Sequence, residues 1–328
     1  PSNPKWLREA VSGHHNLAAL ELRRGELGAA RAGFLGERAA HEKLEAMLPA
    51  DAELQASIAG VDSYLGSIAE RAGDLAEAVA RFGLQVARLE AQVKADPLSA
   101  RMKQRLGSAL GLQSEVMSVA GQLPGALERR RQSLELFETL AAKDGANREW
   151  QAAALNARLK LAVLLRAGGE SVAADRLVQA SWPFAENLAR AAASNRGIAL
   201  SLATAWRLEA QRRAASGETD TAEAAARALA AGKSLVELDR TDENHLHAYA
   251  TAGLLAGAVA LHTGDTGGAR RHWQAALEVM EPRLRASTHW RVLDPVARLL
   301  NVLGRADEGR ALVDQLRRFG YQPLEPWP

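Results

Sequence analysis

Seven glycines return along this chain at an almost constant interval, and this spacing constrains the fold more than any other feature. They are Gly25, Gly73, Gly121, Gly169, Gly217, Gly264 and Gly304. Successive differences between these positions are 48, 48, 48, 48, 47 and 40 residues. A fixed period of this length is the signature of a repeat array, in which each unit packs on its neighbours. The spacing predicts seven units, the last of them reached through a shortened connection.

Small residues flank these glycines at fixed distances. Seven residues before each glycine stand Ala18, Gly66, Ser114, Ala162, Ala210, Gly257 and Ala297. Five residues after it stand Ala30, Ala78, Ala126, Ala174, Ala222, Ala269 and Gly309. Nine residues after it the residue is mostly large, as at Phe34, Phe82 and Trp273, with Arg130 and Ala226 as exceptions. Since two helices pack closely only where their side chains are small, we expect each unit to be a helix pair that crosses at these positions, with the glycine in the turn.

The turns between units also recur. Asp96-Pro97 and Asp144-Gly145 each lie 23 residues after a repeat glycine. Residues of these types end helices and cap the helices that follow. They therefore predict that one unit ends and the next begins at these two points.

Composition favours helix throughout the 328 residues. Ala, Leu, Arg and Glu, which are good helix formers, outnumber Val, Ile and Thr. No run of alternating apolar and polar residues is long enough to predict a strand. We therefore predict an all-α fold, an α-solenoid of about seven antiparallel helix pairs. Six regular units of about 48 residues would fill residues 1–286, and a shortened C-terminal capping unit with a Pro-rich tail would fill residues 287–328.

The capping unit should have a polar outer face, because the end unit of an array has no further neighbour to cover it. Arg305, Asp307, Glu308, Arg310 and Asp314 fit that expectation. The last seven residues contain three prolines, so this tail cannot be helical. It either packs back on the last helix pair or extends freely.

The sequence offers little for catalysis. There is no cysteine, which excludes disulfides, thiolate metal sites and a cysteine nucleophile. His14-His15 and His245-x-His247 lack the i, i+4 spacing of a helical zinc site. Neither a G-x-S-x-G nucleophile turn nor a G-x-x-x-x-G-K-[ST] phosphate loop occurs. We predict no catalytic residues, no metal and no cofactor, and expect that the protein is not an enzyme.

Charge and hydropathy restrict the partners. The chain has 41 basic and 39 acidic side chains, a net charge of +2, and its arginines alternate with glutamates. Direct nucleic-acid binding requires clustered positive charge, so we do not expect it. No apolar run approaches the ~20 residues of a membrane span. The start, Pro1-Ser2-Asn3-Pro4, has no Met and no signal-peptide pattern, so we expect a fragment or a processed chain. We expect a cytoplasmic location, or a periplasmic one if the full-length chain has an upstream membrane anchor.

Two stretches carry a resemblance to a known family. Gly73–Phe82 (GDLAEAVARF) and Gly264–Leu277 (GDTGGARRHWQAAL) resemble the tetratricopeptide repeat. The pattern departs from that family in its period, 48 residues in place of the usual ~34, and in lacking a regular terminal proline. The resemblance implies a right-handed superhelix whose concave face is lined by the first helix of each pair. Long-period arrays like this one are similar to those found C-terminal to signalling or effector domains in bacteria.

The resemblance also implies where a partner binds. Positions ten, six, three and two before each turn glycine should project from the first helices into the concave groove. Their polar members, mixed in charge, suit an extended peptide or a helix. The predicted partner-binding residues are His15, Arg23, Ser63, Ser67, Glu70, Arg71, Glu115, Ser118, Arg166, Arg207 and Gln211.

A column of carboxylates has two interpretations. Seventeen residues past the turn glycine stand Glu42, Glu90, Glu138, Glu186 and Glu281. They form either a ridge that recognises a basic partner or local ion pairs with arginines on the outer face. The local ion pairs are the favoured interpretation, as between Arg38 and Glu42.

We therefore predict a protein–protein interaction scaffold, a sensor or adaptor module of a larger bacterial regulatory or signalling protein, that binds a protein or peptide on its concave face. An upstream effector domain in the full-length chain is expected. An alternative is a small-molecule-sensing regulatory domain with its ligand inside the superhelix. A third is self-assembly through exposed ends. If an apolar face at Trp6–Leu20 is left unsatisfied, an upstream part of the chain is the expected partner.

Overall fold

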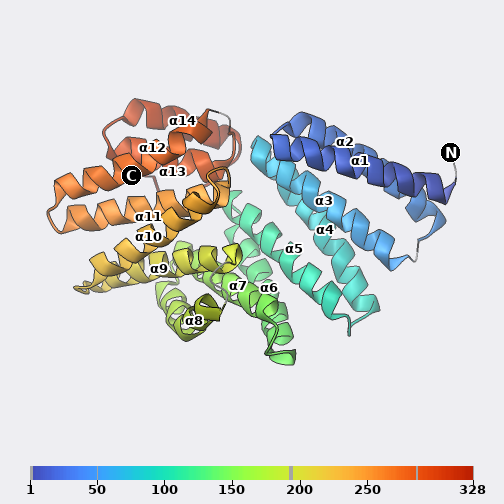
Figure 1. Cartoon of the computed structure of the whole chain (residues 1–328), viewed down its shortest axis with the longest axis horizontal. Helices are drawn as coiled ribbons and strands as arrows, with labels where there is room; N and C mark the ends of the chain where they lie inside the picture. Colours follow the sequence, from blue (N-terminus) through green and yellow to red (C-terminus); the bar gives the residue numbers. More distant parts are fainter. Residues whose placement is uncertain (1–2, 50, 192–194, 286, 328) are drawn as a thin grey trace. The chain divides into compact units, whose positions relative to one another are not determined.

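The computed structural model describes residues 3–49, 51–191, 195–285 and 287–327, and the elements of these ranges are α-helices joined by short turns (Figure 1). Successive helices run antiparallel. The first helices of the pairs are α1 (Pro4–Arg24), α3 (Ala52–Ala72), α5 (Ala100–Val119), α7 (Arg148–Ala167), α9 (Arg196–Ser216), α11 (Glu243–His262) and α13 (Trp290–Val302). The second helices are α2 (Leu27–Met47), α4 (Leu75–Ala95), α6 (Leu123–Lys143), α8 (Ser171–Ala191), α10 (Thr221–Leu238), α12 (Thr266–Leu284) and α14 (Ala306–Arg318). The predicted all-α solenoid of helix pairs is confirmed.

The chain divides into two compact units, Pro1–Leu136 and Phe137–Pro328. The boundary lies inside α6. Each unit is a stack of helix pairs, and each is described below by itself. Most of the helices have 18–21 residues, whereas α13 and α14 have 13 each, so the last pair is shorter than the others.

The turn glycines have the backbone that the repeat requires. Every one of the seven has a positive φ, between 69° and 85°. A residue with a Cβ is strained in this left-handed region, so glycine is the residue that ends the first helix and starts the turn. The constant glycine spacing thus records a backbone constraint.

The start of each first helix is fixed by a cap that also repeats. In each of the pairs from α1 to α11, the residue before the first helix has a side chain that accepts a backbone N–H of the helix's first turn. These capping residues are Asn3, Asp51, Ser99, Asn147, Asn195 and Asp242. The expectation that Asp96 and Asp144 cap the next helix is wrong. The Asp96 carboxylate accepts the Leu98 N–H at 3.2 Å within the turn, and the cap, Ser99, comes three residues later because the turn needs room to reverse the chain.

The helix crossings lie where the small residues predicted them. Ala18, Ala162 and Ala210 are fully buried. A Cβ added to Gly66 would lie 3.0 Å from the Phe82 ring, and one added to Gly257 would lie 2.0 Å from Nε1 of Trp273. The large residue nine positions past the turn therefore occupies the space that the missing side chain leaves. Arg130 fills the same position in the third pair, where its buried Nη2 donates to the Gly111 carbonyl at 2.6 Å.

The fifth pair corrects one detail of this pattern. Ala222 was expected at the crossing and Ala226 stands at the position that is mostly large in the other units, but both are exposed. The turn after Gly217 is longer, so α10 begins at Thr221, four residues after the glycine, whereas α2 begins two residues after Gly25. The buried alanines at the start of α10 are consequently Ala224, Ala225 and Ala228, of which Ala224 and Ala228 lie two positions after Ala222 and Ala226.

We expect Gly257→Ala to destabilise the protein. The new Cβ overlaps the Trp273 indole, which is 8% exposed and donates its N–H to the Leu254 carbonyl at 3.2 Å. Overpacking of this kind costs about 1–3 kcal/mol, so the melting temperature followed by circular dichroism should fall. Gly60→Ala in α3 is the matched control, because a Cβ there meets nothing within 4 Å, and replacing a helical glycine by alanine adds up to about 1 kcal/mol. Equal melting temperatures for the two variants would contradict the packing argument.

Candidate functional site

The first helices of the unit Phe137–Pro328 form one continuous layer. α7 contacts α9, α9 contacts α11, and α11 contacts α13. In tetratricopeptide-like arrays this layer is the face expected to bind a partner. Three of the predicted partner-binding residues lie on it, namely Arg166 on α7 and Arg207 and Gln211 on α9.

A non-helical segment of the chain itself lies on this layer. The tail, Tyr321–Trp327, follows α14 and packs back, so of the two alternatives for the tail the structure shows the packed one. Arg298 of α13 donates to the backbone carbonyls of Glu325 at 2.6 Å and Pro326 at 3.0 Å. Gln211 of α9 donates from Nε2 to the Glu325 carboxylate at 3.2 Å. The tail is therefore held by two first helices that are far apart in the sequence.

Aromatic contacts fix the two ends of the tail. The Trp327 indole N–H donates to Oδ1 of Asp294 at 2.8 Å, and the guanidinium of Arg317 lies 5.6 Å from its ring. Tyr321 is 6% exposed and stacks on Trp290 with ring centroids 5.9 Å apart. Burial, followed by the charge of Asp294, raises the pKa of Tyr321 well above its usual value, so its hydroxyl is neutral near pH 7.

The residues that hold the tail share one register along their helices. Gln211 lies six residues before Gly217, and Asp294 and Arg298 lie ten and six residues before Gly304. These are two of the positions that were expected to line the groove. Asp294 and Arg298 were not among the predicted residues, although the same offset from the last turn glycine identifies them.

The layer is electropositive beside the tail. Burial lowers the pKa of the Arg207 guanidinium, whereas the Glu325 carboxylate raises it and Arg166 lowers it. On α11, burial and then the positive charges of Arg291 and Lys160 lower the pKa of His247 to about 3. His247 is thus a neutral imidazole, and its Nδ1 donates to the Arg291 carbonyl at 3.2 Å. An anionic group is the complement of this surface.

The predicted residues of the unit Pro1–Leu136 lie in more varied surroundings. His15 is turned toward α2, where its Nδ1 lies 3.1 Å from Oε2 of the buried Glu37. Glu70 and Ser118 are buried at 8% and 5% exposure, and the Ser118 hydroxyl donates to the carbonyl of Glu115 in its own helix. Ser63, Ser67, Arg71 and Glu115 are half-buried, and Arg23 is exposed. Their role in binding stays a prediction.

The favoured interpretation of the carboxylate column, local ion pairs, holds at Glu42, whereas Glu90, Glu138 and Glu281 pair with arginines outside their own helices. Glu42 lies 3.1 Å from Arg38, Glu90 lies 3.1 Å from Arg129, and Glu281 lies 3.5 Å from Arg305. Glu138 pairs with Arg158. These carboxylates are 45–59% exposed, so each pair adds little stability.

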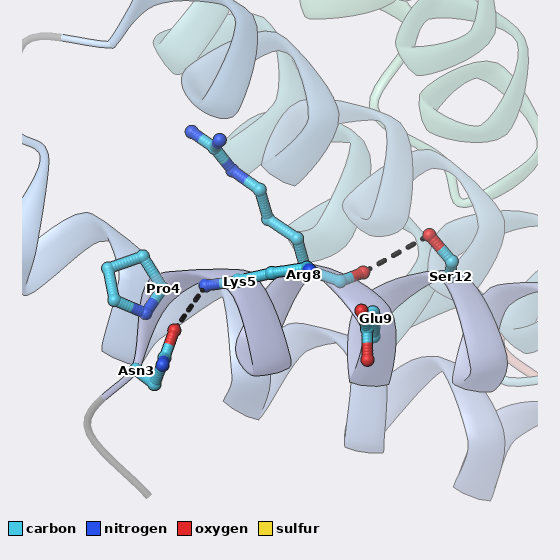
Figure 2. A pocket seen from close by; sticks show the side chains of 6 residues that line it. All are labelled: Asn3, Pro4, Lys5, Arg8, Glu9 and Ser12. Atoms are coloured by element: carbon cyan, nitrogen blue, oxygen red, sulfur yellow. Dashed lines mark hydrogen bonds between the residues drawn. The ribbon is translucent and has the colours of Figure 1, made fainter.

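A hollow on α1 was a further candidate, and Figure 2 shows why it is a poor one. Its lining residues, from Asn3 to Ser12, all belong to the start of one helix. Its hydrogen bonds are those of an ordinary helix start, namely the N-cap at Asn3 and the Ser12 hydroxyl donating to the Arg8 carbonyl, and Arg8 pairs with Asp51 at 3.6 Å. Over the described part of the chain, no group of three or more His, Asp or Glu side chains is placed to hold a metal ion. Nor does any described helix have the length and apolar run that a membrane crossing needs.

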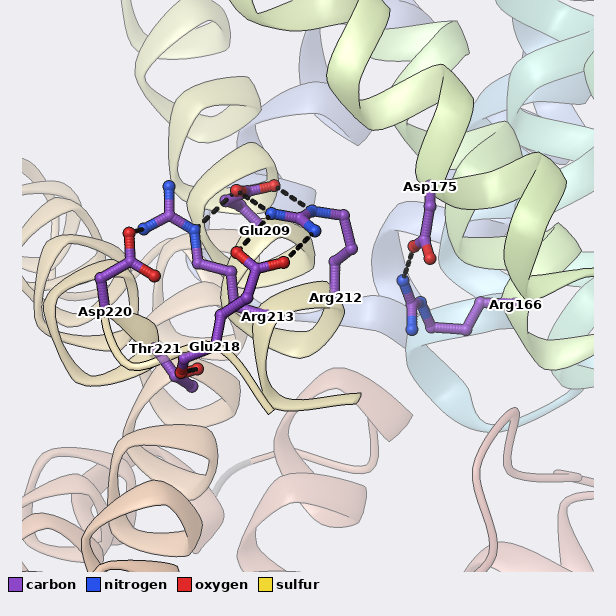
Figure 3. A network of polar contacts seen from close by, with 8 residues as sticks. All are labelled: Arg166, Asp175, Glu209, Arg212, Arg213, Glu218, Asp220 and Thr221. Carbon is purple, nitrogen blue, oxygen red and sulfur yellow. Dashed lines mark hydrogen bonds and ion pairs between the residues drawn. The ribbon is translucent and has the colours of Figure 1, made fainter. Parts of the chain in front are cut away.

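A network of charges closes the long turn between α9 and α10 (Figure 3). Glu209 is 4% exposed and accepts from Arg212 at 2.9 Å and from Arg213 at 2.7 Å. Arg212 also donates to Glu218 at 2.6 Å, and Arg213 pairs with Asp220. The hydrogen bonds from Arg212, together with those from Arg213, lower the pKa of Glu209 to about 2 against the opposing effect of burial. The network fixes the turn that shifts α10 by two residues.

This network predicts acid sensitivity. Because the pKa of Glu209 is lower in the folded chain than its usual value of 4.5, its stabilising contribution is complete above about pH 5 and is lost as the pH falls toward 2. Glu209→Gln should lower the melting temperature at pH 7 and reduce its decrease between pH 5 and 3. Glu223→Gln is the control, because Glu223 makes an exposed pair with Arg227. A pH profile of Glu209→Gln that parallels the parent profile would contradict this assignment.

Comparison with known proteins supports the fold. No protein-family model matches the sequence, and no curated protein matches it. The crystal structure of BtubC (BKLC) from P. vanneervenii aligns with a TM-score of 0.54 at 15% identity, over 78% of this chain and 92% of that one. A monomeric mutant of IFIT1 with Gppp-AAAA aligns with a TM-score of 0.50 at 13% identity, over 94% and 69%.

A tetratricopeptide repeat protein from Parabacteroides merdae aligns over 94% of this chain and 99% of that one, with 10% identity and a TM-score of 0.39. At such identities the likeness to solved structures is one of fold alone. The helix pairs, the left-handed turn glycines and the small-residue crossings of this chain are those of a tetratricopeptide-like array, and the predicted resemblance is confirmed at that level.

Proposed function

We propose that this protein is an interaction scaffold that binds an extended peptide on the first-helix layer of the unit Phe137–Pro328. The observation that supports the proposal is the non-helical tail, whose main chain and side chains are hydrogen-bonded to this layer. A peptide from a partner protein would occupy the same place, with the tail as its competitor in cis.

The contacts to the tail divide into two kinds. Arg298 binds main-chain carbonyls of Glu325 and Pro326, which any extended peptide offers. Gln211 and Asp294 bind side chains, an acid and an indole respectively. The first kind gives affinity and the second gives selectivity. The layer therefore suits a peptide with an acidic residue followed by an aromatic one.

The charge of the layer supports an acidic ligand. Burial is the largest cause of the lowered pKa of His247, and the positive charges of Arg291, Lys160 and Arg207 lower it further. The tail supplies one carboxylate, Glu325, against them. A partner peptide with an acid at the matching position would gain the same attraction, and its affinity would fall with added salt.

Two finer predictions remain proposals. One is a role as the sensor or adaptor arm of a larger bacterial regulatory protein with an upstream effector domain, in which a partner peptide would exchange with the tail on this layer. Small-molecule sensing stays an alternative prediction from sequence, with the same layer as its expected site.

The test uses the tail as the probe. A fluorescent peptide with the sequence of residues 321–327 is titrated into the full chain and followed by fluorescence anisotropy. We expect Trp327→Ala, which loosens the tail in cis and leaves the layer intact, to bind the peptide at least tenfold more tightly than the parent does. Adding Arg298→Ala to this variant removes two charge-assisted hydrogen bonds, worth about 1.5–3 kcal/mol each, and should abolish most of the binding.

The control is Arg271→Ala on α12, a second-helix arginine that is 76% exposed, which should leave the affinity of Trp327→Ala unchanged. Circular dichroism checks that every variant is folded. Equal peptide affinity for the parent and Trp327→Ala, or no loss with Arg298→Ala, would remove the support that the tail gives to the proposal.

A further inference from the structure

Arg207 on α9 is a cation of the first-helix layer that lies beside the tail. It comes four residues before Gln211, so the two side chains are on the same side of the helix. It also comes ten residues before Gly217, the offset at which Asp294 of α13 binds the tail. The guanidinium is half-buried. Within the described ranges it makes one hydrogen bond, from Nη1 to Oε1 of Gln211 at 3.5 Å, and no ion pair.

The Gln211 amide lies between this cation and the acid of the tail. Its Oε1 accepts from Arg207, and its Nε2 donates to the Glu325 carboxylate at 3.2 Å. Burial lowers the pKa of Arg207 and the charge of Glu325 raises it, so the two groups attract each other. The tail carboxylate is nevertheless bound through the amide, and the guanidinium attracts it without direct contact.

The surroundings of Arg207 add positive charge. After burial, the charge of Arg166 on α7 also lowers the pKa of Arg207, and Arg166 is itself paired with Asp175 of α8 (Figure 3). Arg207 and Lys160 both lower the pKa of His247 on α11, although burial is the largest cause. A half-buried guanidinium among like charges is best neutralised by an anion that has more than one negative charge.

We propose that the partner peptide of this layer has a phosphorylated side chain at the position of Glu325, and that Arg207 binds the phosphoryl group. The inference rests on the proposed function and names its ligand class. Phosphoserine has the same number of bonds from Cα to its terminal oxygens as glutamate. It differs in having three such oxygens, arranged tetrahedrally, and a charge of about −1.5 to −2 at pH 7. One oxygen can accept from Gln211 while the others accept from Arg207.

The chemistry of arginine matches this ligand. A guanidinium presents its N–H donors as a planar fork that binds two phosphate oxygens at once, and such charge-assisted bonds are about twice as strong as neutral ones. With the tail in place the same fork has one amide oxygen at 3.5 Å, a distance at which a hydrogen bond is weak. A phosphorylated peptide therefore gains bonds that the tail does not make, and it would displace the tail where an unphosphorylated peptide only competes with it.

The first test compares three fluorescent peptides with the sequence of residues 321–327, in which position 325 is glutamate, serine or phosphoserine. Each is titrated into the full chain with Trp327→Ala, and binding is followed by fluorescence anisotropy. We expect the phosphoserine peptide to bind at least about tenfold more tightly than the glutamate peptide, because charge-assisted hydrogen bonds to Arg207 are added. The serine peptide should bind most weakly, and added salt should reduce the preference for phosphoserine.

The second test identifies the residue. Arg207→Ala, added to the Trp327→Ala chain, should remove most of the preference for phosphoserine. It should weaken the glutamate peptide by less than about fivefold, because Arg207 attracts that acid without an ion pair. Arg196→Ala is the matched control on the same helix, since Arg196 is 62% exposed and lies 3.9 Å from Asp239, and it should leave all three affinities unchanged. Circular dichroism checks the fold of each variant.

Several results would overturn the inference, and they separate it from the proposed function. Equal binding of the glutamate and phosphoserine peptides would exclude phosphoryl recognition and leave the peptide scaffold standing. An equal loss of both peptides with Arg207→Ala would assign Arg207 to the integrity of the layer. Displacement of the phosphoserine peptide by inorganic phosphate at the same concentration would show a site for a free anion. Binding of none of the three peptides would remove the proposed function and this inference with it.

Discussion

The close approach of two helices beside a left-handed glycine is the constraint on which the rest of this structure depends. Gly73 reverses the chain at a φ of 84°, and seven residues earlier Gly66 lets the Phe82 ring lie against the backbone of α3. Once a pair is closed in this way, its outer surfaces are defined, and the next pair can pack only on the side chains that those surfaces present. This local geometry therefore determines which side of each first helix contacts the next first helix, and it also determines that an apolar side of α1 is exposed.

The sequence predicts these features because they come from short-range constraints repeated many times. A positive φ requires glycine, and a close crossing requires a small side chain, so both leave a column in the sequence. The exception shows the limit of the method. In the fifth pair a longer turn shifts the start of α10 by two residues. Ala222 and Ala226, at the positions that the repeat spacing indicates, are exposed, and Ala224 and Ala228 pack against the neighbouring helices instead. Since alanine occupies all four positions, composition gives no sign of the shift.

Contacts between distant residues are harder to predict. Asp62 is fully buried on α3, where Arg38 and Arg81 each approach it to 3.5 Å and Arg88 to 4.0 Å. Burial raises the pKa of Asp62 and these three arginines lower it, a balance that depends on three helices at once. The tail is a similar case. The spacing from the turn glycines predicted Gln211, and the same spacing identifies Asp294 and Arg298. The sequence gives no sign, however, that Glu325, 114 residues after Gln211, forms a hydrogen bond with it.

The first and the last described helix pairs present different faces to solvent. A terminal helix exposes the face that its neighbours would bury. After α14 the chain folds back onto α13. There Tyr321 stacks on Trp290, the Trp327 indole N–H donates to Asp294, and Arg298 donates to the Pro326 carbonyl. α14 itself exposes charged side chains to water. At α1 the equivalent residues remain apolar and exposed. Trp6, Leu17 and Leu20 lie one period of 48 residues before Leu54, Leu65 and Ile68, which are buried between α3 and α2. The apolar side of α1 is therefore the side on which the repeat geometry would pack a preceding second helix.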